Sequence, residues 1–261
     1  MKDYTLMMPE LLGPDEPFDE RLNRFKEILE ECKGKVVFLG GAGVSTGSGI
    51  PDFRSKDGLY NNMDAKYARF QPEYLLSHNC YAQKPQMFYE FYKNLFDLRK
   101  FEPCTTHKKL AELEENGTLA GVVTQNVDML HEKAGSKNVM KIHGTVGTYH
   151  CVRCDKEYDE DWFFEQSELI PRCECGGQVR PNVVLYEEKM PENAWESAQR
   201  AVNDARCLVV AGTSLQVGTA ASLVANYGGR FLVILNNQET PYDKYADVCF
   251  REDMNEVFSK L

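Results

Sequence analysis

A buried strand that runs straight into a cluster of glycines constrains this fold more than any other feature of the sequence. Residues 35–39 read KVVFL, and such an apolar, β-branched run is typical of a strand in a parallel sheet. Residues 40–54 follow as GGAGVSTGSGIPDFR. Glycines allow positive φ, and because they lack Cβ they let backbone N–H groups approach a pyrophosphate. The stretch predicts a dinucleotide site, although glycine clusters also form ordinary turns.

The residues after the glycines differ from those of a dehydrogenase. A dehydrogenase unit continues into a helix and a second strand, and an acidic residue about 20 positions on binds the ribose. Here residues 50–60 form a polar stretch without a strand pattern. The sequence therefore favours a dinucleotide-binding protein of another class.

Strands and helices alternate along the rest of the chain. Apolar residues recur at helical spacing over 18–32 and 85–98, and we expect further helices at 106–115 and near 220–227. Strands are predicted over 120–124, 139–142, 207–211 and 231–235. This order indicates an α/β fold with a doubly wound parallel sheet. Residues 1–17 are polar and rich in proline, and we expect them to be a poorly ordered extension.

The overall charge and the cysteines limit which partners, metal sites and compartments are expected for this protein. A formal charge of −10 argues against direct nucleic-acid binding and suits a positively charged partner such as a lysine-rich segment. We find no secretory signal pattern and no apolar run of membrane-spanning length. Four of the nine cysteines lie close together, which favours a metal site over disulfides. We therefore expect a cytoplasmic protein.

The clustered cysteines predict a zinc site. Cys151 and Cys154 form a C-x-x-C pair, and Cys173 and Cys175 form a C-x-C pair. Two such pairs are typical of a tetrahedral four-thiolate zinc site. A closed site of this kind is structural and has no open position for a substrate, so zinc-catalysed hydrolysis is disfavoured.

Polar residues follow two of the predicted strands. Gln125, Asn126 and Asp128 come directly after the strand over 120–124, where open α/β sheets place ligand-binding groups. Asn and Asp are also common in ordinary turns. His131 and His143 are both candidate bases, and spacing alone does not choose between them.

The glycine stretch closely resembles the signature of the sirtuins, the NAD-dependent protein-lysine deacylases, and the resemblance extends from Lys35 to the end of the chain. It implies a Rossmann-like NAD-binding domain over 18–143 and 178–261, with a mobile cofactor loop at about 52–78. A small zinc-binding module over 144–177 would be inserted between the two parts.

The resemblance also assigns roles to individual residues. It selects His143 as the general base, since the catalytic histidine of sirtuins is followed by glycine shortly before the first zinc cysteine. Asn126 would order the reacting groups, and Phe53 would shield the sugar carbon after nicotinamide leaves. The implied NAD-binding residues are Gly41, Ala42, Gly43, Ser45, Thr46, Asp52, Phe53, Arg54, Gln125, Asn126, Val127, Asp128, Gly212, Thr213, Ser214 and Asn236.

The substrate segment and the second cysteine pair depart from the sirtuin pattern. An acylated-lysine peptide would pair as an added strand with Val183, Val184, Leu185 and Tyr186. The glycine that usually follows is replaced by Glu187, whose charge predicts a preference for basic flanking residues. Sirtuins usually carry C-x-x-C as the second pair, so His150 is an alternative fourth zinc ligand.

The resemblance implies an NAD-dependent protein-lysine deacylase that yields nicotinamide, free lysine and O-acyl-ADP-ribose. The alternatives are NAD hydrolysis or mono-ADP-ribosyl transfer on the same fold, and an NAD-sensing or zinc-ribbon binding module. In the segment 63–78 we find no Tyr-and-Arg pair of the kind associated with acidic acyl groups. An acetyl group or a plain longer chain is therefore expected.

Overall fold

Parallel strands form the sheet at the centre of this computed structural model, which describes residues 11–52, 58, 63–216 and 218–261. The strand order is β3-β2-β1-β7-β8-β9, and each ladder is parallel. The bounds are Val36–Gly40 (β1), Leu119–Thr124 (β2), Val139–Lys141 (β3), Cys207–Ala211 (β7), Phe231–Leu235 (β8) and Val248–Phe250 (β9). The predicted doubly wound sheet is confirmed, and the predicted strands differ from the observed ones only at their ends.

Helices cover both faces of this sheet. Because side chains alternate along a strand, Val36 and Phe38 of β1 enter one core and Val37 and Leu39 enter the other. The first core is covered by α1 (Phe18–Glu31), α5 (Thr105–Glu115) and α10 (Met254–Ser259), and α6 (Leu130–Ala134) packs beside α5. The second core is covered by α8 (Glu192–Asp204) and α9 (Gly218–Ala225).

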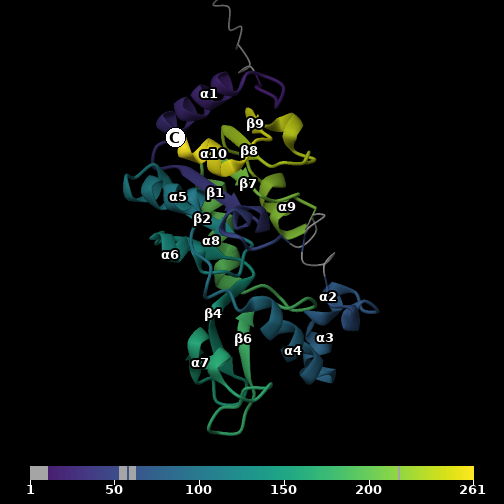
Figure 1. The fold of residues 1–261 in the computed structure, drawn as a ribbon. Coiled ribbons are helices and arrows are strands. Elements are labelled where there is room, and N and C mark those ends of the chain that lie inside the picture. The colour runs from purple at the N-terminus through teal and green to yellow at the C-terminus, as the bar shows by residue number, and fades with distance from the viewer. Residues whose placement is uncertain (1–10, 53–57, 59–62, 217) are drawn as a thin grey trace, which may run out of the picture.

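A smaller antiparallel sheet lies beyond the carboxyl ends of the parallel strands, in the lower part of Figure 1. Its strands, in the order β5-β4-β6, are Glu157–Asp159, Gly144–Cys151 and Val179–Val183. Four helices gather around it, namely α2 (Pro72–Leu75), α3 (His78–Gln83), α4 (Pro85–Phe96) and α7 (Glu160–Glu165). Short 3-10 turns occur at Ala42–Val44, Thr46–Ser48, Ala65–Tyr67 and Asp243–Tyr245.

The smaller part of the molecule has an aromatic core of its own. The rings of Tyr149 and Phe163 stack with centroids 3.9 Å apart, and the Tyr89 hydroxyl of α4 donates to the Val179 carbonyl at 2.9 Å. Residues 63–98 therefore share their core with the antiparallel sheet rather than with the parallel one. The helical spacing over 85–98 predicted a buried helix, but it did not show which sheet the helix covers.

Part of the predicted N-terminal extension lies within the described residues. Leu12 forms a bridge with Val248, because its N–H donates to the Asp247 carbonyl at 2.9 Å and its carbonyl accepts from the Cys249 N–H at 3.0 Å. The segment 11–17 is thus held at the edge of β9 through Leu12. Over the part of the chain that the structure describes, no helix is long and apolar enough to cross a membrane.

The loops after β1 and β7 contact each other through glycine. The Gly43 N–H donates to the Gly212 carbonyl at 2.9 Å, and a Cβ on Gly43 would lie 2.7 Å from the Gly212 Cα. Gly212 has a φ of +61°, and a Cβ there would lie 2.5 Å from the Val44 nitrogen. Neither position has room for a side chain.

We therefore expect Gly212→Ala to lower the free energy of unfolding by about 2–4 kcal/mol, since it combines a left-handed residue with overpacking against backbone. Gly218→Ala, at the first residue of α9, is the control, because a Cβ there would meet nothing within 4 Å. Urea unfolding of both variants measures the difference. Equal stability of the two variants would contradict this account of the loop contact.

Candidate active site

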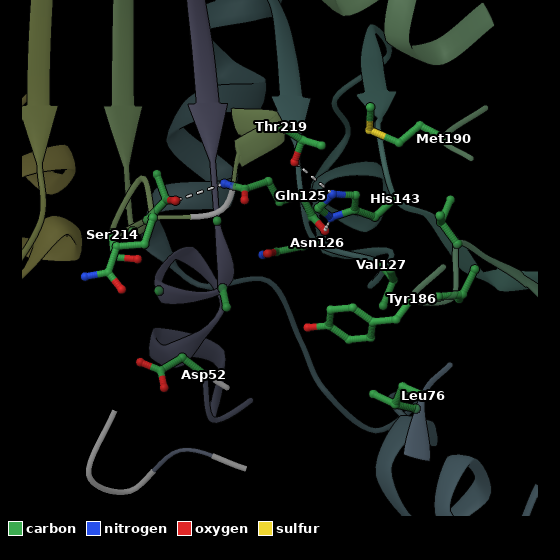
Figure 2. A pocket seen from close by; sticks show the side chains of 18 of the residues that line it. Asp52, Leu76, Gln125, Asn126, Val127, His143, Tyr186, Met190, Ser214 and Thr219 are labelled. Carbon is green, nitrogen blue, oxygen red and sulfur yellow. Dashed lines mark hydrogen bonds between the residues drawn. The ribbon is translucent and has the colours of Figure 1, made fainter. Parts of the chain in front are cut away.

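A cavity of about 550 Å³ opens at the carboxyl ends of the parallel strands. From β1 the sheet grows toward β2 and β3 on one side, and from β7 it grows toward β8 and β9 on the other, so the strand order reverses between β1 and β7. Open α/β sheets bind ligands at such a switch point. The loops after β1, β2, β7 and β8 line one side of the cavity, and residues 183–188 of the smaller part line the other. Figure 2 shows these side chains converging on one space.

Most of the predicted site residues line this cavity. They are Gly41, Ala42, Gly43, Asp52, Gln125, Asn126, Val127, His143, Val183, Val184, Leu185, Tyr186, Gly212, Thr213, Ser214 and Asn236. Ser45 and Asp128 line a smaller adjoining cavity with Ala42, Asn126 and Val127. Thr46 lies outside the lining of both cavities, and its hydroxyl donates to the Gly43 carbonyl. Phe53 and Arg54 lie outside the described residues.

The glycine stretch meets the sequence expectation only in part: Gly49 has a φ of +89° in the left-handed region, but Gly41 and Gly43 do not follow the expectation. Gly41 has a φ of −123°, which is extended backbone, so it does not use the left-handed region. The N–H groups of Gly41 and Gly43 donate to the carbonyls of Ala211 and Gly212 at 3.0 and 2.9 Å. These two N–H groups hold the loops together and are engaged within the protein. The glycines thus serve close packing between loops.

A buried hydrogen-bond network joins the loops after β1 and β2. The Asn126 side-chain amide donates to the Ser45 hydroxyl at 2.9 Å, and Ser45 donates to the Asp128 carboxylate at 2.8 Å. The other Asp128 oxygen accepts from the Leu130 N–H at the start of α6. Burial raises the pKa of Asp128, although the bonds from Leu130 and Ser45 oppose this shift. Asn126 is therefore held at a fixed position in the cavity wall.

His143 presents one ring nitrogen to the cavity. Its Nδ1 lies 3.0 Å from the Gln125 carbonyl oxygen, and because that oxygen only accepts, Nδ1 carries the proton of the neutral ring. Nε2 then holds the lone pair and lies 3.5 Å from the Thr219 hydroxyl oxygen (Figure 2). Burial lowers the pKa of His143, and the Gln125 bond only partly opposes it. His143 is thus a neutral base near pH 7.

His131, the other candidate, lies outside the cavity. It is 1% exposed, and burial together with the neighbouring His107 lowers its pKa to about 3. Its ring packs against His107 with centroids 4.7 Å apart. Among the described residues neither ring nitrogen has a hydrogen-bond partner. The geometry therefore favours His143 as the base.

Side chains join the loops after β2 and β7 and fix the loop after β8 internally. The Gln125 amide donates to the Thr213 hydroxyl at 3.0 Å, and the Asn236 amide donates to the Gln238 carbonyl at 2.8 Å. Ser214 and Asp52 lie on the same side of the cavity in Figure 2. A row of amide, hydroxyl and carboxylate groups therefore lines this side.

The backbone of the predicted substrate segment is already partly paired. The Tyr186 N–H donates to the Leu76 carbonyl and its carbonyl accepts from the His78 N–H, both at 3.0 Å. The Val184 N–H donates to the His143 carbonyl at 2.9 Å. A peptide strand added here would have to use the remaining backbone groups of the segment.

Glu187 occupies the conformation that glycine favours. Its φ is +75°, which explains in physical terms why glycine is usual at this position in the sirtuin pattern. Its carboxylate accepts from the Asn79 N–H at 3.0 Å, in the first turn of α3. We expected this charge to favour basic residues that flank the substrate lysine. In the structure the carboxylate is already bound to an N–H in the first turn of α3, so such residues would compete with that bond.

The next residue, Glu188, anchors the same segment. Its carboxylate accepts from the Arg180 guanidinium at 2.7 and 3.0 Å and from the Leu185 N–H at 3.0 Å. Burial opposes ionisation, but these bonds outweigh it and lower the pKa of Glu188 to about 2. The cavity wall on the substrate side is thus fixed by charge as well as by backbone pairing.

The four predicted cysteine ligands gather at the tip of the smaller sheet. All four Sγ atoms lie within 4.8 Å of one another, and the closest pairs, Cys151–Cys175 and Cys154–Cys173, are 3.5 and 3.6 Å apart. A tetrahedral zinc with bonds of about 2.3 Å needs sulfur atoms about 3.8 Å apart. The cluster is compatible with a structural zinc. His150 instead bonds to the Asn182 side chain, so the C-x-C pair supplies both remaining thiols.

Several residues that line the cavity were not predicted from the sequence. Leu76, Tyr92, Phe96 and Met190 form apolar wall, and Thr219 faces His143. Tyr92 and Phe96 belong to the helical stripe that indicated only core. Thr219 lies in an apolar helix that follows the loop carrying Ser214. Its position in the sequence shortly after Ser214 was the one indication that it could line the site.

Fold and site together define a class of protein. A doubly wound parallel sheet carries a polar cavity at its switch point, with a neutral histidine facing a second, apolar wall. The module that bears this wall carries a cluster of four cysteines able to hold a metal ion. These are the features of a nucleotide-binding α/β enzyme with a structural metal module.

Comparisons with known proteins give the family. The model of the Sir2 family matches residues 41–219. An NAD-dependent protein deacetylase of Clostridium perfringens is 43% identical over 245 residues, which cover 93% of this chain and 99% of that relative. A solved structure described as Sir2-p53 peptide-NAD+ is 36% identical with a TM-score of 0.79, and covers 92% of this chain and 96% of its own. The chain belongs to the Sir2 family, the sirtuins.

Replacing one thiol tests the cluster. We expect Cys175→Ser to lose most bound zinc and to unfold at lower temperature, because the tetrahedral set is broken and structural zinc contributes folding free energy. His150→Ala and Cys104→Ser are the controls and should retain zinc. Metal content per chain and thermal unfolding measure the effect. Zinc loss in His150→Ala with zinc retained in Cys175→Ser would show that the ligand set is wrong.

Proposed function

We propose that this protein is an NAD-dependent protein-lysine deacylase that releases nicotinamide, free lysine and O-acyl-ADP-ribose. The observation that carries the proposal is the position of His143, whose basic Nε2 faces a cavity shared by the glycine loop and residues 183–186. The names of the relatives support it, since they are NAD-dependent protein deacetylases. A further Sir2 structure, 35% identical with a TM-score of 0.79, is described as bound to acetylated peptide.

NAD fits the polar side of the cavity. Volumes of about 300–1,000 Å³ are usual for small-ligand sites, and this cavity has about 550 Å³. By the resemblance, Gln125 and Asn126 would hold the nicotinamide-side ribose of NAD. Thr213 and Ser214 would lie near the ribose and phosphates, and Asn236 would lie at the adenosine ribose. These residues line the cavity. NAD supplies a sugar carbon that becomes electrophilic as nicotinamide leaves. The protein's part is to bind both substrates, to exclude water and to remove a proton.

His143 is the group that removes the proton. Its Nδ1–H is fixed by the Gln125 carbonyl, so Nε2 is held toward the cavity, where a ribose hydroxyl would donate. Asn126 is fixed by Ser45 and would orient the same sugar. The base is therefore positioned before the substrates bind.

The apolar side of the cavity suits an uncharged acyl group on lysine. Leu76, Phe96, Val183, Leu185 and Met190 line it. Among the described lining residues there is no lysine or arginine to pair with an acidic acyl group. Acetyl or a longer aliphatic chain is the substrate class that this wall favours.

The domain division and the compartment remain part of the proposal. A zinc module over 144–177 would hold the substrate wall without taking part in chemistry. The predicted cofactor loop at about 52–78 lies partly outside the described residues, and residues 63–78 of it pack into the core of the smaller part. A cytoplasmic location is supported by the gathered free thiols, which persist in a reducing compartment.

In the decisive assay the protein is mixed with NAD and an acetyl-lysine peptide, and the mass of the peptide and the release of nicotinamide are measured. We expect deacetylation only with NAD, and a fall of about 100-fold or more in His143→Ala, because loss of a general base typically costs 10²–10⁴-fold. His150→Ala, outside the cavity, is the matched control. Nicotinamide release without peptide would instead favour NAD hydrolysis or ADP-ribosyl transfer, and binding without turnover would favour NAD sensing.

The rate should also depend on pH in a defined direction. Because burial lowers the pKa of His143 below its usual value of about 6.5, the base is deprotonated at pH 7. Activity should therefore stay constant from pH 7 downward until the pH falls through that lowered pKa. A profile of kcat/KM against pH measures it, and an acid limb centred above pH 7 would refute a neutral resting base.

A further inference from the structure

Thr219 is the side chain that faces the basic nitrogen of His143. It is the second residue of α9 and lines the same cavity, and its hydroxyl oxygen lies 3.5 Å from Nε2 (Figure 2). Its own carbonyl accepts from the Ser222 hydroxyl at 2.7 Å, which helps to fix the first turn of the helix. The threonine therefore approaches the ring from the side opposite to Gln125.

The hydroxyl can serve both protonation states of the ring. With neutral His143, Nδ1 holds the proton and Nε2 accepts, so the Thr219 hydroxyl donates to it. Once Nε2 has taken a proton, the same hydroxyl oxygen can accept from Nε2–H. A hydrogen bond to a charged group is roughly twice as strong as a neutral one, so the contact favours the imidazolium.

No ion pair contributes to the titration of His143 among the described residues. The causes of its lowered pKa are burial and, opposing it, the Gln125 carbonyl. The acidic side chains in the lining are Asp52, Glu187 and Glu188, and Glu187 and Glu188 are engaged with Asn79 and Arg180. The two groups that bond to the ring, the Gln125 carbonyl and the Thr219 hydroxyl, are both uncharged.

We propose that Thr219 is a positioning residue for the base: its hydroxyl donates to Nε2 of His143 in the resting protein, yields that lone pair when the ribose hydroxyl donates its proton to Nε2, and then accepts from the Nε2–H of the imidazolium. The proposal rests on the deacylase function for its role in the reaction. The Thr219–His143 interaction itself does not depend on that function.

The test compares Thr219→Val, which keeps the shape and removes the hydroxyl, with Thr219→Ser, which keeps the hydroxyl. Ser259→Ala is the matched control, since it removes a hydroxyl that makes the same kind of bond, to the Glu256 carbonyl at 2.7 Å, in α10 and outside the cavity lining. The chain has five histidines, so NMR titration of ring-labelled protein can follow each of them, and the His143→Ala spectrum assigns His143.

We expect Thr219→Val to lower the pKa of His143 by about half to one pH unit, which is the scale of one hydrogen bond. It should move the acid limb of the kcat/KM profile by the same amount and reduce kcat about 3- to 10-fold, with the KM for NAD little changed. Thr219→Ser should follow the unmodified protein.

An unchanged His143 titration in Thr219→Val overturns the proposal, whatever the activity. The same holds if Thr219→Ser loses as much as Thr219→Val, because the hydroxyl would then not be responsible. A shifted titration in protein that deacetylates no peptide would refute the proposed function and leave the Thr219–His143 interaction standing.

Discussion

The backbone contact between Gly43 and Gly212 is the constraint on which the whole cavity depends. It brings the loops of β1 and β7 together at the point where the strand order reverses, with no room for a Cβ on either residue. The network from Ser45 through Asn126 and Asp128 then ties the loop after β2 to the same point. Three loops from three strands are thereby fixed before any ligand arrives, and preorganisation of this kind reduces the cost of binding.

The two parts of the molecule contribute different chemistry to the cavity. The parallel sheet supplies polar groups, and His143, just past the end of β3, supplies the base. The smaller part supplies an apolar wall, which its aromatic core and the Arg180–Glu188 ion pair hold in place. Substrates that are polar at one end and apolar at the other fit such a division.

Sequence alone predicted much of this arrangement, and the failures have physical causes. Apolar runs and glycine spacing located the strands, the cysteine pairs located the thiolate cluster, and the family pattern chose His143 over His131. Local patterns did not show that residues 63–98 pack on the antiparallel sheet, because the partner of a buried helix face is decided by tertiary packing. The contact between Thr219 and His143 also depends on tertiary packing, and so it could not be predicted from local sequence.

The glycine loop shows a subtler limit. Its spacing predicted a ligand site, and the loop does line the cavity, yet Gly41 and Gly43 contact the loop after β7, as their engaged N–H groups show. Likewise, the departure at Glu187 indicated an added charge, whereas the structure shows a left-handed residue whose carboxylate caps α3. A sequence pattern identifies a constrained position more readily than the contact that constrains it.

The central claim is that this cavity transfers an acyl group from lysine to the ribose of NAD. The most direct test is a mass-spectrometric balance of products after reaction of NAD with a peptide carrying an isotopically labelled acetyl-lysine. The account predicts that the label leaves the peptide and appears on ADP-ribose, with equal amounts of nicotinamide, deacetylated peptide and acetyl-ADP-ribose. Label recovered as free acetate with NAD intact, or ADP-ribose formed while the label stays on the peptide, would contradict it.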